Sequence, residues 1–368
     1  MSKELDFKSS LISLLIMCIG LFGNILNLIV FSNKSMRKIT TFRYLLYLSI
    51  IDMFVLVIGA TDASLTFGFN IQIRLNNLLT CKLHTFLTYF LTHMSSILLT
   101  MANVERAFVV YNAKILREYS RSINNYRIGS SIKKYHIEVV ILMIAIILVA
   151  INLHYLIYLD LNYIDQENES LILGNNLSFM CFPPNNSPYY NFLTYIWVWI
   201  DMCLYSLIPF FIMVICSLII IFKINITVNK SSIGKKAFER RSKRNKQLLA
   251  MLAMTNLYFI ICSLPLCIVM VYKKFKESSE NDDDETGMET IQTIFNILSY
   301  TNNAFNFIFF IIFSEKYRNV MWAIFSYDQT KPKRQDSKSR DNHNTYNITN
   351  NGEDRSRCQN EEYLIYKL

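Results

Sequence analysis

Three carboxylates lie within otherwise apolar stretches of this 368-residue chain, at Asp52, Asp62 and Asp201. Each stretch is long enough to cross a lipid bilayer, where a central carboxylate costs about 2.5–3.5 kcal/mol even on the lenient insertion scale. A carboxylate near the end of a span can reach the membrane interface. This explanation is plausible for Asp62, weaker for Asp201 and poor for Asp52. Asp52 therefore needs partners inside the bilayer.

Other apolar stretches supply polar side chains that could surround Asp52. They are Asn24, Ser95, Asn302, Asn303 and Asn306. The i, i+4 spacing places Asn302 and Asn306 on one helix face. Carboxylate, amide and hydroxyl oxygens suit a hard cation such as sodium, or a hydrated hydrogen-bond network. Plain hydrogen bonding between helices is an equally good interpretation.

The elements that must position these residues are seven apolar stretches. A membrane-spanning helix needs about 20 such residues. The stretches are Leu11–Phe31, Leu45–Phe67, Leu83–Val104, Val139–Tyr158, Tyr195–Phe222, Leu248–Tyr272 and Ile291–Phe313. The chain is 52% hydrophobic and only 18% charged, as expected when lipid is the solvent. The runs are continuous rather than alternating, which excludes a barrel. We predict an all-α membrane protein, a seven-transmembrane helix bundle.

The placement of the positive charge predicts the orientation of this bundle. Lys and Arg are concentrated in the first, third and fifth connections, whereas the fourth, Leu159–Phe192, has neither. The positive-inside rule puts the basic connections in the cytoplasm and the N-terminus outside. The net charge of +9 is therefore a topology signal, and no nucleic-acid partner is expected. Three glycosylation sequons agree, because they all lie in the fourth connection, at Asn168, Asn176 and Asn185.

This topology divides the chain into three parts. Residues 1–10 form a short extracellular N-terminus, residues 11–325 the transmembrane domain, and residues 326–368 a polar cytoplasmic tail that we expect to be disordered. Of the eight cysteines, only Cys81 and Cys181 fall on the oxidising outer face. We predict a disulfide between them that tethers the fourth connection over the mouth of the bundle.

Enzymes and transporters are poor alternatives. The histidines of the spans, His84, His93 and His154, lie at different depths without metal-type spacing, so no catalytic centre is expected. A transporter would show repeated or interrupted helices in two matching halves, and an odd number of spans argues against such halves.

The third span carries a further signal at its inner end. Glu105 and Arg106 lie there, and Arg106 follows Cys81 by 25 residues. With this spacing, a set of motifs along residues 10–325 resembles rhodopsin-like (class A) G-protein-coupled receptors. The motifs are Gly23-Asn24, Leu48-Ser49-Ile50-Ile51-Asp52, Pro209, Cys262-Ser263-Leu264-Pro265, Asn302 to Asn306 and Ser314-Glu315-Lys316-Tyr317-Arg318.

The resemblance implies several roles for these residues. Glu105 and Arg106 would form the switch that engages a heterotrimeric G protein, with Pro209 and Pro265 as hinges. The side chains around Asp52 would form a central sodium pocket, and Ser314–Phe325 an amphipathic helix along the inner leaflet. Arrestin and membrane lipid would be further partners. The chain departs from the family at Phe307 and Phe310, which replace a proline and a tyrosine.

The outer residues bear on the ligand. Tyr300 replaces the retinal-binding lysine of opsins, and Thr88 replaces the amine-binding aspartate of aminergic receptors. The outer connections are rich in Asp and Glu, which favours a cationic ligand. The candidate ligand-binding residues are Asp62, Thr88, His93, Trp197, Asp201, Asn296 and Tyr300. We expect a plasma-membrane receptor for a basic neuropeptide, with a resemblance to invertebrate receptors for FMRFamide-like peptides. A chemosensory or lipid receptor of the same fold is the alternative.

Overall fold

A computed structural model describes residues 2–112, 130–163, 179–184, 187–230, 235–277 and 285–326. The three sequons at Asn168, Asn176 and Asn185 lie outside these ranges, as do residues 113–129 of the third connection and the C-terminal tail from residue 327.

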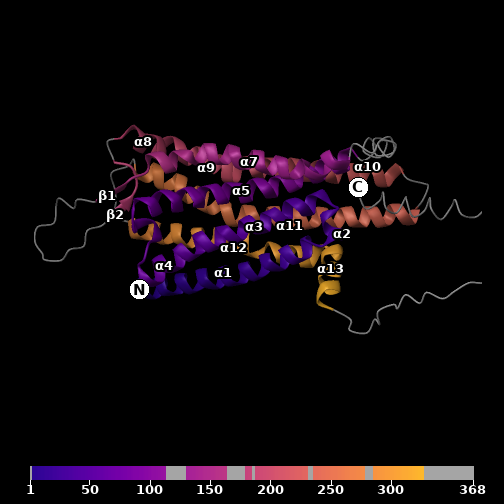
Figure 1. Cartoon of the computed structure of the whole chain (residues 1–368), viewed down its shortest axis with the longest axis horizontal. Coiled ribbons are helices and arrows are strands. Elements are labelled where there is room, and N and C mark those ends of the chain that lie inside the picture. Colours follow the sequence, from indigo (N-terminus) through magenta and orange to yellow (C-terminus); the bar gives the residue numbers. More distant parts are fainter. Residues whose placement is uncertain are drawn as a thin grey trace, which may run out of the picture.

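The fold is a bundle of seven long helical segments that run side by side (Figure 1). The first is α1 (Ser2–Phe31), and the second comprises α3 (Thr40–Val55), the π-helical turn η1 (Leu56–Ala60) and α4 (Thr61–Phe69). Next come α5 (Leu78–Tyr111) and α7 (Ser130–Tyr158). The fifth segment is α8 (Pro188–Asn191), η4 (Phe192–Trp197), α9 (Val198–Met202), η5 (Cys203–Leu207) and α10 (Ile208–Lys230). The last two are α11 (Lys235–Glu277) and α12 (Glu285–Phe313).

Short elements close the two ends of the bundle. At one end, helices α2 (Lys34–Arg37) and α13 (Glu315–Phe325) lie close together (Figure 1). At the other, strands β1 (Leu161–Tyr163) and β2 (Phe179–Cys181) form an antiparallel pair in which Leu161 faces Cys181, and the 3₁₀ turn η2 (Ile73–Leu75) precedes α5. We call these the basic end and the hairpin end.

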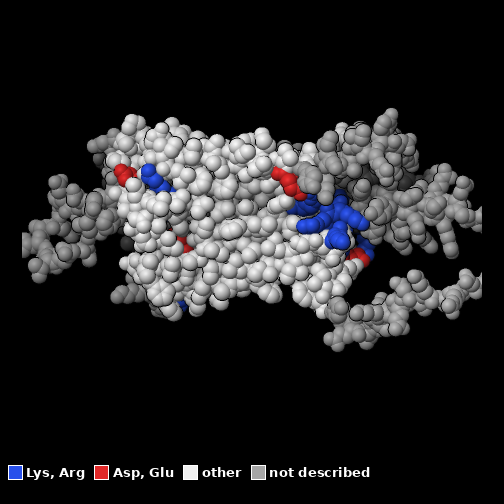
Figure 2. Space-filling model, in the orientation of Figure 1, with Lys and Arg blue, Asp and Glu red and all other residues white. Residues whose placement is uncertain are grey.

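The distribution of charge matches a membrane-spanning bundle. Figure 2 shows Lys and Arg side chains gathered at the basic end, while the middle of this face is nearly free of charge. Six helices are each long and apolar enough to cross a membrane, and α12, which meets α13 at an angle of 96°, supplies the seventh. One side of α7 presents apolar residues outward, where lipid would cover them: Val139, Leu142, Met143, Ile146 and Ile147 are all exposed.

The first helix begins earlier than its apolar run. Helix α1 is already helical from Ser2, so it includes most of residues 1–10, whose extracellular location stays a prediction. Ser10 is buried and its hydroxyl donates to the Ser64 carbonyl oxygen at 2.8 Å. Ser64 returns a hydrogen bond to the Ser10 carbonyl oxygen at 3.2 Å. The last residues before the apolar run thus dock the helix against α4.

Proline shapes the fifth segment. Pro209 has no N–H, so it cannot donate to the carbonyl oxygen of Tyr205, four residues earlier. The Ser96 hydroxyl of α5 donates to that oxygen instead, at 2.7 Å. Two π-helical turns, η4 and η5, precede Pro209 and flank the short helix α9. Each π turn changes which side chains face the bundle, so the direction of α9 residues is set locally.

Helices α1 and α12 approach closely because α1 has glycine at positions 20 and 23, where it faces α12. A Cβ atom added to Gly23 would collide with the ring of Phe307, and one added to Gly20 would lie 2.8 Å from the Cα atom of Ala304. Phe307, which stands where the resembled family has proline, thus fills the space that Gly23 leaves.

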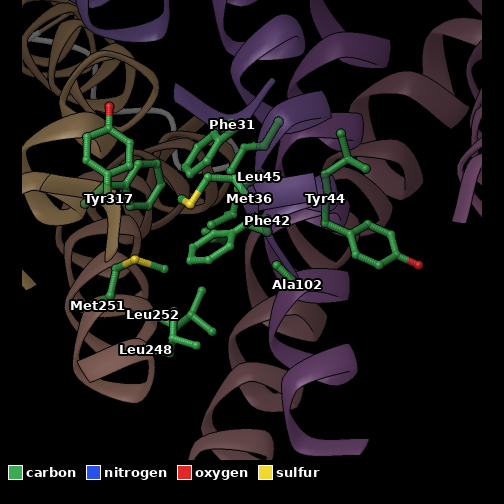
Figure 3. Packing of buried hydrophobic residues seen from close by; sticks show 14 of the residues in the cluster. Phe31, Met36, Phe42, Tyr44, Leu45, Ala102, Leu248, Met251, Leu252 and Tyr317 are labelled. Carbon is green, nitrogen blue, oxygen red and sulfur yellow. The ribbon is translucent and has the colours of Figure 1, made fainter. Parts of the chain in front are cut away.

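A cluster of apolar side chains holds the basic end together (Figure 3). Phe31 from α1 stacks on Phe42 of α3 with ring centroids 5.6 Å apart, and it meets Tyr317 of α13 edge-on at 5.4 Å. Phe310 is fully buried in the same cluster, 5.4 Å from Phe31. The ring at position 310 therefore packs α12 against α1 and α13. A tyrosine hydroxyl here would need a partner inside an apolar cluster.

The expected disulfide is present at the hairpin end. Cys81, at the start of α5, bonds to Cys181 of β2, and the two are 100 residues apart in sequence. Asn77 caps α5 through a reciprocal pair of hydrogen bonds with Thr80, which fixes the turn just before Cys81. The disulfide therefore links strand β2 to the capped N-terminal end of α5.

Replacing Cys81 and Cys181 together by serine should lower the thermal unfolding temperature of the purified protein. Loss of a disulfide that closes a long loop typically costs about 2–5 kcal/mol. The matched control is Cys18→Ser, since Cys18 is an exposed free thiol. An unfolding temperature equal to that of this control would show that the disulfide does not stabilise the fold.

Candidate functional site

A cavity of about 140 Å³ lies toward the hairpin end, between α5, the fifth segment, α11 and α12. Its lining is mostly aromatic, aliphatic and hydroxyl-bearing: Thr88, Tyr89, Thr92, Val198, Asp201, Met202, Tyr205, Leu266, Cys267, Met270, Val271, Asn296, Ser299 and Tyr300. Asp201 is the one charged residue among them. Thr88, Asn296 and Tyr300, predicted to contact ligand, lie in this wall, and their ligand contacts stay a prediction.

Asp201 faces the cavity because of the local helix geometry. It lies on α9, the five-residue helix between the π turns η4 and η5. Its side chain is 23% exposed, and one oxygen, Oδ1, lies 2.8 Å from Nε2 of His93. The described residues donate no hydrogen bond to the other oxygen, Oδ2. One carboxylate oxygen is therefore bound by His93, and the other has hydrogen-bonding capacity left for a ligand.

His93 supports Asp201 from behind rather than lining the cavity. Its side chain is fully buried on α5. Its second ring nitrogen, Nδ1, lies 3.3 Å from Nδ2 of Asn152 on α7. The same amide nitrogen donates to the Leu148 carbonyl oxygen at 2.9 Å. Asn152 was not among the predicted site residues, although a lone amide in the apolar fourth span could have drawn attention to it.

Asp62 and Trp197 lie outside the wall of this cavity, and their contacts with a ligand stay a prediction. Asp62 is absent from the cavity wall, and its Oδ1 accepts a hydrogen bond from the Ile73 backbone N–H at 3.2 Å. It also lies 3.9 Å from Nε2 of His84. Trp197 is buried between α5 and α7, with its ring centroid 4.2 Å from that of His154. Asp62 therefore anchors the connection between α4 and α5, and Trp197 packs beside the cavity.

A second polar site lies at the centre of the bundle, around the fully buried Asp52. The carboxylate accepts three hydrogen bonds. Ser95 Oγ and Asn303 Nδ2 donate to Oδ1 at 2.6 and 2.7 Å, and Asn306 Nδ2 donates to Oδ2 at 2.9 Å. Asn24 joins the network by donating to the Asn303 carbonyl oxygen at 2.9 Å. Four segments of the bundle thus meet at one carboxylate.

The partners on α12 differ in one respect from the expected pair. Asn303 and Asn306, at i and i+3, donate hydrogen bonds to Asp52, whereas among the described contacts the buried Asn302 makes no hydrogen bond to it. The Oδ1 atoms of Asn302 and Asn306 are buried and accept no hydrogen bond from the residues that the structure describes. Unsatisfied buried carbonyl oxygens beside a carboxylate are the ligands that a hard cation prefers. The residues present therefore fit a sodium ion.

The basic end holds Arg106 and an unexpected pair of amides. Arg106 is only 3% exposed on α5. About one turn deeper in the bundle, Asn103 Nδ2 donates to Asn256 Oδ1 at 3.1 Å, and Asn256 Nδ2 donates to Asn103 Oδ1 at 2.9 Å. Both side chains are buried. This reciprocal pair joins α5 to α11 and was not predicted. The pairing of Arg106 with Glu105 stays a prediction.

A second contact joins the basic part of α11 to α13. Glu315 Oε2 accepts a hydrogen bond from Gln247 at 3.1 Å and lies 3.2 Å from Lys243 Nζ. The Gln247 amide and then the Lys243 ammonium hold the pKa of Glu315 below its usual range. Helix α11 is thus connected to α5 inside the bundle and to α13 at its surface.

If the Asp52 network binds sodium, adding NaCl should raise the unfolding temperature of the purified protein at constant ionic strength, with choline chloride as the balancing salt. An ion that binds only the folded state stabilises it by mass action. Asp52→Asn removes the charged ligand and should abolish the rise. The control is Asp62→Asn, which lies away from the network and should keep it. A sodium response in Asp52→Asn equal to that of the unaltered protein would exclude this site.

Comparison with protein families matches residues 23–310 to the family described as 7 transmembrane receptor (rhodopsin family). No curated protein matches the chain significantly. The matched region runs from Gly23 on α1 to Phe310 on α12, so it includes the cavity, the Asp52 network and the Asn103–Asn256 pair. With seven helical segments in the described structure and more than half of the chain matched, the chain belongs to the rhodopsin family of seven-transmembrane receptors.

Proposed function

We propose that this receptor binds an extracellular cationic ligand, a basic peptide, in the cavity around Asp201 and activates a heterotrimeric G protein at the basic end. One observation carries the proposal. A single carboxylate lies in a cavity whose described lining has no Lys or Arg, and one of its oxygens is free of hydrogen bonds from the described residues. A carboxylate of this kind within a membrane span favours a cationic partner.

The size of the cavity favours the end of a peptide over a whole molecule. Its volume of about 140 Å³ is below the usual range of roughly 300–1,000 Å³ for sites that enclose a drug-sized ligand. One side chain or terminal group would enter, while the rest of the ligand remained near the hairpin end. Tyr89, Tyr205 and Tyr300 provide ring faces for an aromatic or guanidinium group.

The membrane orientation agrees with this assignment. The basic end carries the clustered Lys and Arg side chains of Figure 2, which the positive-inside rule places in the cytoplasm. The hairpin end and the cavity then face the outside of the cell, where peptides would reach a plasma-membrane receptor. A small odorant or a lipid is the alternative ligand. The largely apolar wall suits such a molecule, but the carboxylate of Asp201 would then lack a partner.

Activation would require α11 to move away from α5 at the basic end. Pro265 lies inside α11 and removes one backbone hydrogen bond, which gives the helix a point of bending. Movement of the part of α11 between Pro265 and the basic end, which includes Asn256, would separate Asn256 from Asn103 and uncover Arg106. The amide pair therefore stabilises the arrangement in which Arg106 is buried.

Asp201→Asn should weaken activation by basic amidated peptides by about 10- to 100-fold, because it removes a charge-assisted contact worth about 1.5–3 kcal/mol. The measurement is G-protein activation in cells that express the receptor and are challenged with a library of such peptides. Asp62→Asn is the matched control, since Asp62 lies outside the cavity wall. Equal losses in both variants would remove Asp201 as the specific counter-ion.

The same assay needs a control for coupling. Arg106→Ala, with surface expression confirmed, should abolish the response to every peptide while leaving peptide binding measurable. A response that persists in Arg106→Ala would contradict the assigned role of Arg106. Failure of every peptide on the unaltered receptor, with odorants or lipids active instead, would favour the alternative ligand.

Asn256→Leu should raise basal G-protein activation several-fold. It leaves the buried amide of Asn103 without its partner, which costs about 1–3 kcal/mol in the packed arrangement. The double variant Asn103→Leu, Asn256→Leu should return toward the basal level, because both partners are then apolar. Thr255→Val is the matched control, since Thr255 donates only to the Met251 carbonyl oxygen of its own helix. Equal basal activity in Asn256→Leu and Thr255→Val would contradict this role of the pair.

A further inference from the structure

Gly59 of the π turn η1 meets a residue of the cavity wall. A Cβ atom added to Gly59 would lie 2.5 Å from Cε1 of Tyr300 and 2.7 Å from its hydroxyl oxygen. Carbon atoms in contact are normally about 3.5–4.0 Å apart. The ring edge of Tyr300 therefore occupies the space that any other side chain at position 59 would need.

The backbone conformation of Gly59 does not require glycine. Gly59 is buried within a helical turn, in a conformation that alanine also adopts and with a better helix propensity. A π turn contains one more residue than an α-helical turn, so it changes which side chains face the neighbouring helix. The turn η1 therefore determines which residue faces α12, and the approach of Tyr300 explains why that residue has no side chain.

Tyr300 lies between a packed cluster and the cavity. The residue belongs to a buried apolar cluster with residues of α1, η1, α4 and α5, among them Ile16, Leu56, Ala63 and Leu91. It also lines the cavity and is 9% exposed. Because a packed protein interior leaves few voids, a ring displaced from Gly59 would move toward the cavity.

The two backbones on either side of this contact are held in place. On α12, Asn303 and Asn306 follow Tyr300 by three and six residues, and both are hydrogen-bonded in the buried network at the centre of the bundle. Behind η1, a Cβ atom added to Gly20 of α1 would lie 2.5 Å from Leu56 Cδ1, so α1 packs tightly against this turn. A side chain at position 59 would therefore displace the tyrosine ring rather than a helix.

We propose that Gly59 is a specificity-determining residue that keeps Tyr300 out of the cavity and so leaves room for a single aromatic ring of the ligand. The proposal rests on the proposed binding of a basic peptide at Asp201, and it names the group that enters beside this carboxylate. An apolar cavity of about 150 Å³ holds one benzene molecule, and this cavity has a volume of about 140 Å³. The ligand class is therefore a peptide whose cationic residue is next to a terminal residue with one aromatic ring.

The first test uses the ligand-free receptor and is independent of the proposed function. Structures of Gly59→Ala and of the unaltered receptor, determined by electron cryomicroscopy, should differ at Tyr300, whose ring moves into the cavity while η1 and α12 keep their positions. The atoms that must move belong to the end of a side chain and not to the backbone, so the variant should fold. A ring that stays in place while η1 moves away from it would overturn the proposal.

The second test measures the binding of arginyl-phenylalaninamide and arginyl-alaninamide, two probes that differ only in the phenyl ring. The unaltered receptor should bind the first about 10- to 100-fold more tightly, because burial of the ring contributes about that factor. In Gly59→Ala this preference should fall about tenfold or more, since the shape of an apolar pocket discriminates by such factors, while the affinity for arginyl-alaninamide should change little. Gly68→Ala is the matched control, because its Cβ atom would meet the Ser10 hydroxyl, outside the cavity wall. An unchanged preference in Gly59→Ala would overturn the proposal, and so would an equal loss of affinity for both probes.

A double variant separates this role from a general effect on the fold. Tyr300→Leu replaces the ring by a shorter side chain, so adding Gly59→Ala to it should leave the preference within about twofold of that of Tyr300→Leu alone. A further large loss in the double variant would show that Gly59 does not act through Tyr300. Absence of binding of both probes to the unaltered receptor would contradict the peptide proposal, while the structure of Gly59→Ala would still decide whether Gly59 sets the position of Tyr300.

Discussion

The hydrogen-bonding of Asp52 is the constraint on which the rest of the bundle depends. A fully buried carboxylate among apolar helices is tolerated only if its oxygens find donors. Those donors come from α5 and α12, and α1 is joined through the backbone of Asn303. Four segments therefore have a fixed rotation and depth at the level of Asp52. The cavity on one side of this level and the amide pair on the other are built on helices whose positions it determines.

The two membrane carboxylates of the polar interior differ in how completely the protein satisfies them. Asp52 accepts three hydrogen bonds on two oxygens, whereas Asp201 has one partner on one oxygen. Asp52 is fully buried, while the side chain of Asp201 is 23% exposed to the cavity. A saturated carboxylate holds helices together. A half-satisfied carboxylate at a cavity wall has capacity left for another molecule, and this difference supports the proposal that the ligand binds at Asp201.

Much of this architecture could be predicted from the sequence, because membrane burial makes a simple demand on each span. Seven apolar runs predicted the seven helical segments, and redox logic predicted the Cys81–Cys181 bond. Other features depended on rotation about the helix axes. The choice of Asn303 over Asn302 as the ligand of Asp52, and the turn of Asp62 toward the Ile73 backbone, follow from helix phase and from π turns that leave no clear sequence signal. The burial cost of the acidic side chains does not point to Asn103, Asn152 or Asn256, because none of the three makes a hydrogen bond to a carboxylate among the described residues.

One face of α5 links these features along the length of the bundle. His93, Ser96, Thr100 and Asn103 recur at intervals of three or four residues, so their side chains lie on one side of the helix. His93 contacts Asp201, and one turn on, Ser96 donates to the Tyr205 carbonyl oxygen that Pro209 leaves unpaired. Farther along, Asn103 pairs with Asn256 of α11. A ligand that displaces α9 at Asp201 therefore acts on the helix whose other end holds α11 in place. Because each contact is a hydrogen bond with a buried side chain of α5, breaking it has a cost. Such discrete contacts suit a receptor with two distinct states better than a continuously deformable one.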